Sequence, residues 1–449
     1  MPPKAPPEIA RQVALAIVRS LRSAGHTAFF AGGCVRDELL GLSPTDYDVA
    51  TDATPDRISA LFRRTNEVGA AFGVVLVTLG PQEGLAAAAT VEVATFRSEG
   101  PYTDRRRPDR VSFSDPRADA LRRDFTINAL FLDPEGDGPL PPVIADVATV
   151  PHPVPGMGRI IDLVGGVEDV RRRLLRAVGE PDARLAEDHL RALRAVRLAA
   201  RLGFAIDPPT ASAIRRHARE LLGVSRERIG DELRRILAHP TRAAAIELLQ
   251  SLELDAPVLA EAHSASEPRI LRLVSSGPGQ AAAEPLHSSL GLALAAWALD
   301  RGLRPDPQAI ESVVARWRDA LCLSNDESQA FREVLHAYRH LCTGWLSDRV
   351  PAQKRAVRSG FEGGLVLLGI THPAAAAQVA TRLEELRATP SGLRPAPLVT
   401  GDDLVAAGYK PGPAFKGVLE RVYDAQLEDR IQTREQGMEL AHTLAHQTG

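Results

Sequence analysis

The sequence has little cysteine, few aromatic residues and no long apolar run. Each of these shortages excludes some classes of protein. Only 3 of its 449 residues are cysteine and no two form a Cys-x-x-Cys pair, which fits a reducing cytoplasm. Aromatic residues make up 4%, so the cores must be built mainly from Leu, Val, Ile and Ala, which favours helices. The longest uncharged run, residues 363–381, contains Pro373, His372 and Gln378, so we expect no membrane span. The N-terminus carries no apolar stretch of the kind found in secretory signals.

Length and charge predict several domains with a basic middle. A chain of 449 residues exceeds what one core usually holds, so we expect two to four domains. The formal net charge is −3, yet residues 171–240 hold 16 Arg and no Lys against 9 Asp or Glu. A solvated helix face with salt bridges is one interpretation. Because the planar guanidinium binds phosphate bidentately, the exclusive use of Arg also suggests phosphate or nucleic acid.

Hydrophobic patterning predicts an α/β part followed by an all-α part. Apolar residues recur every four positions over 9–21, which predicts a helix that ends before Gly25. Strands are predicted at 27–31, 47–50, 74–79 and 91–96, with a helix over 55–61. Seven prolines over 134–155 predict a loop or peripheral insertion. Beyond residue 165 we predict no strand, and helices at 185–202, 209–222, 228–238 and 414–426.

Acidic residues on two predicted strands suggest a metal site. Asp46 and Asp48 are two positions apart, so their side chains point to one face of a strand. Glu92, in an otherwise apolar strand, could join them. Oxygen ligands without His or Cys suit Mg²⁺ that keeps its waters and binds substrate phosphates.

A glycine turn precedes these acids. Gly32 and Gly33 join a strand to a helix, where backbone N–H groups can approach a triphosphate, and Arg36 can bind a phosphate. The alternative interpretation is a tight turn without a ligand. No Gly-x-x-x-x-Gly-Lys-Ser/Thr motif occurs, so a P-loop NTPase is not supported.

Taken in order, these motifs resemble those of one family. The glycine turn, Asp46-x-Asp48, the run from Arg122 to Ala129, and Glu187-Asp188-His189-Leu190-Arg191 with two further arginines are similar to class II tRNA nucleotidyltransferases. That family contains the CCA-adding enzymes and the bacterial poly(A) polymerases. The resemblance covers residues 25–240, and 400–404 with 433–435 look like the tail of the CCA-adding branch.

The resemblance implies a fold and a role for each motif. The fold would be a polymerase-β-like α/β head with a small mixed sheet over 1–165, a helical nucleotide-selecting and RNA-binding neck over 166–240, and a helical tRNA-binding body and tail over 241–449. Two Mg²⁺ ions would be held by Asp46 and Asp48, with Glu92 as a third catalytic acid. The implied nucleotide-binding residues are Gly32, Gly33, Arg36, Arg122, Arg123, Asp124, Asp188, Arg191, Arg194 and Arg197, and Arg201 would bind RNA.

The neck motif also has a physical interpretation. If residues 185–202 form one helix, Asp188 and Arg191 lie side by side on its polar face, opposite an apolar face. An acceptor beside a donor complements the amine and ring nitrogen that cytosine and adenine share, whereas uracil and guanine present the reverse order. The pair could therefore select CTP and ATP without a template.

We accordingly predict an enzyme that adds C, C and A to the tRNA 3′ end from CTP and ATP. The loop with Asp104-Arg105-Arg106, which CC-only relatives shorten, favours one that completes the terminal A, and residues 68–73 resemble the CCA-adding pattern. A bacterial poly(A) polymerase, an A-adding-only enzyme, a non-catalytic tRNA-binding protein and a small-molecule nucleotidyltransferase remain alternatives. The sequence does not determine the oligomeric state.

Overall fold

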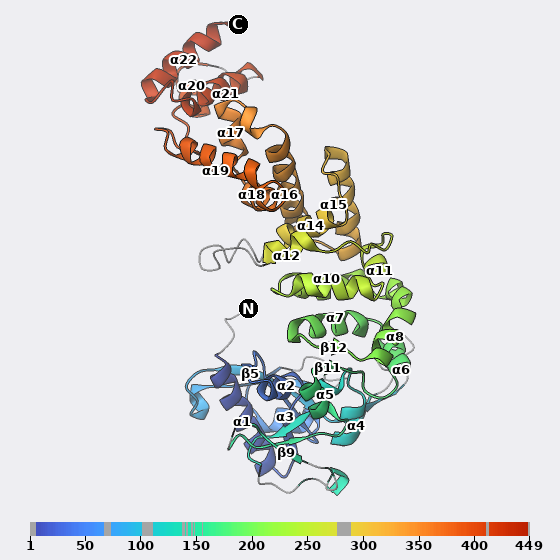
Figure 1. Ribbon diagram of the computed structural model, residues 1–449. Coiled ribbons are helices and arrows are strands. Elements are labelled where there is room, and N and C mark those ends of the chain that lie inside the picture. Colours follow the sequence, from blue (N-terminus) through green and yellow to red (C-terminus); the bar gives the residue numbers. More distant parts are fainter. Residues whose placement is uncertain are drawn as a thin grey trace. The chain divides into compact units, whose positions relative to one another are not determined.

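The computed structural model describes residues 6–66, 73–100, 111–136, 140, 142–144, 147, 149–154, 156–275, 289–409 and 413–447 (Figure 1). The chain divides into two compact units, residues 1–232 with 248–263 and residues 233–247 with 264–449. Within the described ranges, every helix is too short or too polar to cross a lipid bilayer.

An eight-stranded mixed sheet lies in the first unit, as the sequence predicts. The strand order is β3-β4-β5-β2-β1-β8-β10-β9, and β2 and β5 are parallel whereas the other neighbours are antiparallel. The strands are β1 (Ala28–Ala31), β2 (Asp48–Thr51), β3 (Thr65–Asn66), β4 (Val74–Leu79), β5 (Ala89–Thr95), β8 (Phe131–Asp133), β9 (Thr149–Pro151) and β10 (Arg159–Ile161). A separate hairpin pairs β6 (Arg97–Glu99) with β7 (Val111–Phe113).

Aromatic packing holds the centre of this sheet. The rings of Phe29, Phe96 and Phe131, from three parts of the sequence, lie with centroids 5.8–6.3 Å apart and are almost fully buried. Helix α1 (Pro7–Ser23) contacts β1, β2 and β5 and buries Val13 and Ile17, as its four-residue periodicity predicts. Burial of these aromatic and aliphatic side chains stabilises the positions of β2 and β5, the strands that carry Asp48 and Glu92.

Helices fill the rest of the first unit and continue into the second. They are α2 (Gly33–Leu39), α3 (Pro55–Leu61), α4 (Pro116–Leu121), α5 (Gly166–Arg172), α6 (Pro181–Glu187), α7 (Arg191–Leu202), α8 (Pro208–Arg216), α9 (Arg226–Leu237), α10 (Arg242–Ser251) and α11 (Asp255–Leu259), with short 3₁₀ segments at 81–83, 126–128 (η3), 142–144 and 218–223.

Three sequence predictions are wrong here. The predicted helix 185–202 is interrupted, because Asp188 is extended (φ −150°, ψ 104°) between α6 and α7. Residues beyond 165 do contain strands, because β11 (Leu174–Leu175) and β12 (Ala205–Ile206) form a short parallel pair. The proline-rich stretch is not wholly peripheral, since it supplies β9 to the main sheet.

The second unit is helical. Its helices after α9 and α10 are α12 (Arg269–Ser275), α14 (Leu290–Asp300), α15 (Pro307–Leu321), α16 (Asn325–Thr343), α17 (Val350–Ala356), α18 (Phe361–Thr371), α19 (Pro373–Arg387), α20 (Gly401–Ala406), α21 (Pro413–Leu427) and α22 (Arg434–Gln447), with a 3₁₀ turn at 345–347. Helix α16 packs on α14, α15 and α18. Gly364 permits the close approach of α18, because a Cβ there would lie 2.7 Å from the Tyr338 backbone nitrogen.

Candidate active site

The predicted acids lie on or beside the parallel strand pair β2–β5. Asp48 is the direct register partner of Glu92 across the β2–β5 pair, so both side chains project from the same face of the sheet. Asp46 precedes β2 by two residues and is exposed, as is Glu92, whereas Asp48 is partly buried. The structure therefore brings Asp48 and Glu92 to one face, and the Asp46 carboxylate lies near enough to act on the charge of Asp48.

The electrostatics of this cluster fit a bound cation. Burial, the Glu92 carboxylate and the Asp46 carboxylate raise the pKa of Asp48 to about 6, and only Arg123 opposes them. A cation would relieve this accumulation of negative charge. Among the described side chains, no group of three or more acidic, His or Cys ligands is assembled to hold a metal alone. This arrangement suits Mg²⁺, which takes one or two carboxylates and completes its shell with water and substrate phosphates.

The glycine turn lies against the Arg122–Asp124 motif. Gly32 has φ +79°, a conformation that favours glycine, and a Cβ on it would lie 2.9 Å from Nη1 of Arg123. Arg36 is 5% exposed, donates to the Asp37 carboxylate (2.6 and 2.8 Å) and to the Asn128 side-chain oxygen, and lies beneath Gly33. The arginine predicted to bind phosphate thus also joins α2 to η3.

A buried carboxylate that the sequence analysis missed orients two of the predicted residues. Asp119, on α4, is 1% exposed and accepts hydrogen bonds from Arg122 (2.6 and 2.9 Å) and Arg123 (3.0 and 3.1 Å). Burial would raise the pKa of Asp119, but the guanidinium groups of Arg123 and Arg122 hold it below its usual value. Its spacing of three and four residues before the arginines was the signal available in the sequence.

Asp124 ties the strand-bearing part to the neck. Its Oδ2 accepts two hydrogen bonds from Arg194 on α7 (2.8 and 3.0 Å), and its Oδ1 accepts from the Phe125 backbone and from Asn128. Although burial raises it, the pKa of Asp124 is lowered to about 2 by Arg194 and these hydrogen bonds. Two motifs 70 residues apart in sequence therefore share one ion pair.

Asp188 and Arg191 do not form the side-by-side pair that a continuous helix would give. Arg191 donates through Nη1 to the Arg184 carbonyl and to Glu187, whereas Asp188 accepts from Arg228 (2.6 Å). The break after Glu187 separates the two residues from a common helical face. Arg228, on α9, was not predicted from the sequence.

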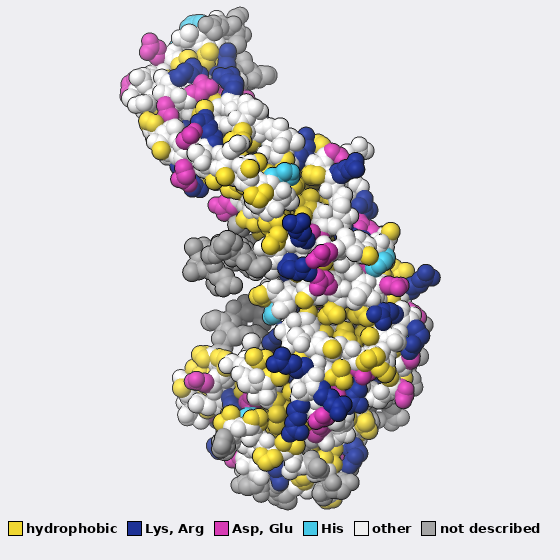
Figure 2. Space-filling view, viewed as in Figure 1, with side chains coloured by type: hydrophobic (Ala, Val, Ile, Leu, Met, Phe, Trp, Pro, Cys, Tyr) yellow, Lys and Arg dark blue, Asp and Glu magenta, His cyan; other side chains and the backbone are white. Residues whose placement is uncertain are grey.

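The remaining neck arginines follow α7 as its periodicity predicts. Arg197 donates to the buried Glu232 (2.6 Å), a residue missed in the sequence, and Arg201 approaches the Asp37 carboxylate of α2 at 3.8 Å. Figure 2 shows basic and acidic side chains mixed on the visible face rather than an unbroken basic surface. Many neck arginines therefore balance local carboxylates.

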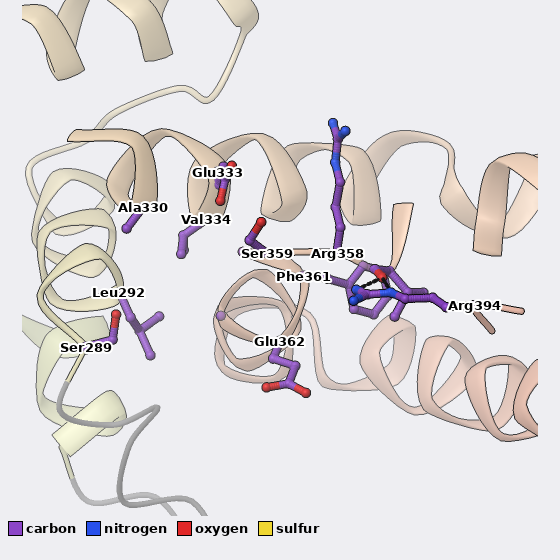
Figure 3. A pocket seen from close by; sticks show the side chains of 13 residues that line it. Ser289, Leu292, Ala330, Glu333, Val334, Arg358, Ser359, Phe361, Glu362 and Arg394 are labelled. Atoms are coloured by element: carbon purple, nitrogen blue, oxygen red, sulfur yellow. Dashed lines mark hydrogen bonds between the residues drawn. The ribbon is translucent and has the colours of Figure 1, made fainter. Parts of the chain in front are cut away.

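A pocket in the second unit is lined by residues of mixed charge, unlike the acidic cluster around Asp48. It lies among α14, α16 and the start of α18, and has a volume of about 340 Å³. Figure 3 shows Arg394 turned to the Val357 carbonyl and Arg358 pointing away, while Glu333 and Glu362 also belong to its lining. This mixture does not favour an anion such as phosphate.

Two sequence features lie outside the described residues. The loop with Asp104-Arg105-Arg106 falls in 101–110, and nearly all of the segment 68–73 falls in 67–72. The inferences drawn from them stay predictions.

Comparisons with known proteins agree with the motifs. Residues 28–176 match the model of the poly A polymerase head domain, and residues 203–266 match a probable RNA- and SrmB-binding site of polymerase A. The chain is 33% identical over 417 residues to the CCA-adding enzyme of Levilactobacillus brevis, which covers 91% of both chains. It is 42% identical over 253 residues to that of Geobacillus thermodenitrificans, about half of each chain.

A solved structure is similar over nearly the whole length. The crystal structure of the Bacillus stearothermophilus CCA-adding enzyme in complex with CTP superimposes with a TM-score of 0.70, at 26% identity, covering 99% of this chain and 100% of that one. The head with its mixed sheet and the helical remainder are thus those of the known fold.

Proposed function

Because the chain belongs to the family of CCA-adding enzymes, we propose that it is a nucleotidyltransferase that adds C, C and A to the 3′ end of tRNA. CTP and ATP are the substrates, no template is used, and pyrophosphate is released. The supporting observation is that residues from separate motifs contact one another in the structure. Asp48 and Glu92 are register partners on β2 and β5, and Asp124 of the Arg122–Ala129 motif binds Arg194 of the neck. The reaction belongs in the cytoplasm, where tRNA matures.

The acids and the glycine turn have distinct roles in this reaction. The 3′ hydroxyl attacks the α-phosphate of the bound nucleotide, and the bond to pyrophosphate breaks. Two Mg²⁺ ions, when bound by Asp46 and Asp48, would neutralise charge on the attacking and leaving oxygens. Glu92 adds negative charge beside Asp48 and so favours cation binding. Gly32, Gly33 and the Arg36 guanidinium beneath them hold the triphosphate.

The motif from Arg122 to Asp124 shapes the ribose and phosphate site. Arg123 lies beside Gly32, and Asp119 fixes its guanidinium in place. Asp124 orients Arg194, so a nucleotide between the glycine turn and α7 would contact groups that are already held.

Base selection rests with Asp188 and Arg191 despite the break between them. Arg191 uses only Nη1 in the hydrogen bonds of the described residues, so Nη2 and Nε can donate to a base. Asp188 binds Arg228 through Oδ2, and its oxygens retain further acceptor capacity. Together with Arg194 and Arg197 they form the nucleotide side of the neck.

The helical segments supply the RNA-binding surface. We assign residues 1–165 to the catalytic head, 166–240 to the neck and 241–449 to the body and tail, which hold the acceptor arm by its A-form shape. Arg201, at the far end of α7 from Arg191, contacts the RNA backbone.

A direct assay tests the proposal. Purified protein is incubated with Mg²⁺, a tRNA lacking its last three nucleotides, and each labelled nucleotide in turn. We expect CTP incorporation on this tRNA and one ATP addition after two C residues. Continued ATP addition would indicate a poly(A) polymerase. ATP addition only to tRNA that already ends in CC would indicate an A-adding enzyme. No incorporation would indicate a non-catalytic protein.

A further inference from the structure

A buried polar cluster lies behind the segment that carries the acids. Its centre is Glu38 of α2, whose side chain is 6% exposed. Oε1 of Glu38 accepts a hydrogen bond from the Tyr47 hydroxyl (2.6 Å) and another from Nε of Arg11 on α1 (2.9 Å). The carboxylate therefore joins two helices to the residue between Asp46 and Asp48.

The proline-rich stretch contributes the fourth member. His152 follows β9, and its side chain is 2% exposed. Its Nδ1 accepts from the Val154 backbone N–H (3.0 Å), and since an N–H can only donate, the proton of the neutral ring is on Nε2. That nitrogen lies 3.1 Å from Oε2 of Glu38. Within the described residues neither of these two buried atoms makes an aligned hydrogen bond, so Oε2 of Glu38 is in close contact with the ring nitrogen, whereas Oε1 accepts two hydrogen bonds.

The position of Tyr47 explains why this cluster matters. Asp46 and Tyr47 precede the first residue of β2, so they lie outside its paired stretch. The Tyr47 ring packs edge-on against Phe30 (centroids 5.4 Å), and Arg11 lies over the same Phe30 ring.

We propose that Glu38, Tyr47 and His152 are positioning residues that fix the Asp46–Asp48 segment relative to the glycine-turn helix α2. Glu38 lies on the helix that begins at Gly33, and Tyr47 is covalently bound to both metal-binding acids. Their hydrogen bond therefore sets the spacing between the triphosphate and metal positions. The buried ring of His152 lies against the other oxygen of Glu38 and so restricts rotation of the carboxylate. This inference rests on the proposed function of the acids.

The test compares Tyr47→Phe, His152→Ala and His152→Gln. Tyr47→Phe keeps the ring and removes the hydroxyl, and the amide of His152→Gln can still donate to Glu38. We expect the first two to lower kcat and the affinity for Mn²⁺, measured by EPR without substrate, by about tenfold, as loss of groups that orient metal ligands does. KM for tRNA should stay within about twofold, since charge contacts to the RNA backbone set it. His152→Gln should restore most of both losses.

Tyr423→Phe is the matched control, because the hydroxyl of Tyr423 in the helical unit also donates a part-buried hydrogen bond, to the Pro395 carbonyl (3.0 Å). It should leave kcat and Mn²⁺ affinity unchanged. Wild-type kcat and Mn²⁺ affinity in Tyr47→Phe and His152→Ala, with only a lower melting temperature, would show a merely structural role. So would a His152→Gln variant no better than His152→Ala. Absence of nucleotide addition by the wild-type protein would instead refute the proposed function, while the Mn²⁺ measurement would still report on positioning.

Discussion

Asp48 on β2 and Glu92 on β5 are direct partners in a parallel register, so two carboxylates 44 positions apart in sequence face the same side of the sheet. Parallel pairing is unusual in this sheet, where the other neighbouring strands are antiparallel. It aligns the two acids without a turn between the strands. Their mutual repulsion favours a bound cation, and this relation leads to the first prediction.

Asp48→Asn should reduce nucleotide incorporation by at least about a thousandfold while tRNA affinity stays within about threefold, because the cation site and not the RNA surface is changed. Incorporation is measured with labelled CTP, and tRNA binding by filter retention. In EDTA the variant should melt no lower than wild type, because it removes one of several like charges. A variant retaining a tenth of wild-type turnover would contradict the assignment.

Asp124→Asn should destabilise the protein in a pH-dependent manner. The pKa of Asp124 is lowered from 3.8 to about 2, so its contribution is fully present above pH 3.8 and is lost as the pH falls through 2. The shift corresponds to about 2 kcal/mol at pH 7. Urea unfolding at pH 7 and at the lowest pH where both proteins fold should show the difference between them shrinking. A constant difference would mean that the ion pair with Arg194 is not its source.

The sequence predicted the parts of the fold that repeat a pattern. Four-residue apolar spacing gave α1, and β-branched runs gave β4 and β5, because burial of one face leaves that periodicity. Two-residue alternation predicted Asp46 and Asp48 on one strand face, but β2 begins at Asp48, so Asp46 precedes the strand. Glu92 was predicted as a possible third acid, and it is the register partner of Asp48.

The rest depends on contacts that leave no periodic signal. Apolar spacing continues from Leu185 to Leu193 across the break at Asp188, so the sequence pattern does not show the break. In the structure Asp188 is extended and accepts a hydrogen bond from the distant Arg228. The pair β11–β12 has two residues per strand, too few for a pattern. His152 lies among prolines, and its burial follows from the distant Glu38.

Lys354→Ala should destabilise the helical unit. This ammonium is 1% exposed and donates to Thr389, Ser391 and the Leu427 carbonyl (2.7–2.9 Å), which joins α17 to the segments after α19 and at the end of α21. Truncation leaves buried acceptors unpaired, a loss of about 3 kcal/mol. Urea unfolding measures it, with the exposed Lys416→Ala as control. CTP binding should not change, and equal stability of the two variants would contradict the role.

Arg191→Ala should lower incorporation of CTP and ATP and relax the rejection of UTP. A site that matches a base edge discriminates by leaving polar groups unpaired, at ~1–3 kcal/mol for each lost bidentate match. Arg201→Ala is the matched control on the same helix, since Arg201 lies at the opposite end of α7 and approaches Asp37 rather than Glu187. It should weaken tRNA binding without changing nucleotide choice. Misincorporation is measured with each of the four nucleotides on both variants.

Because Glu187 holds Arg191 at Nη1, Glu187→Gln should show a weaker form of the same defect. If Arg191→Ala instead lost tRNA affinity and kept wild-type discrimination, the residue would bind the RNA backbone and base selection would lie elsewhere.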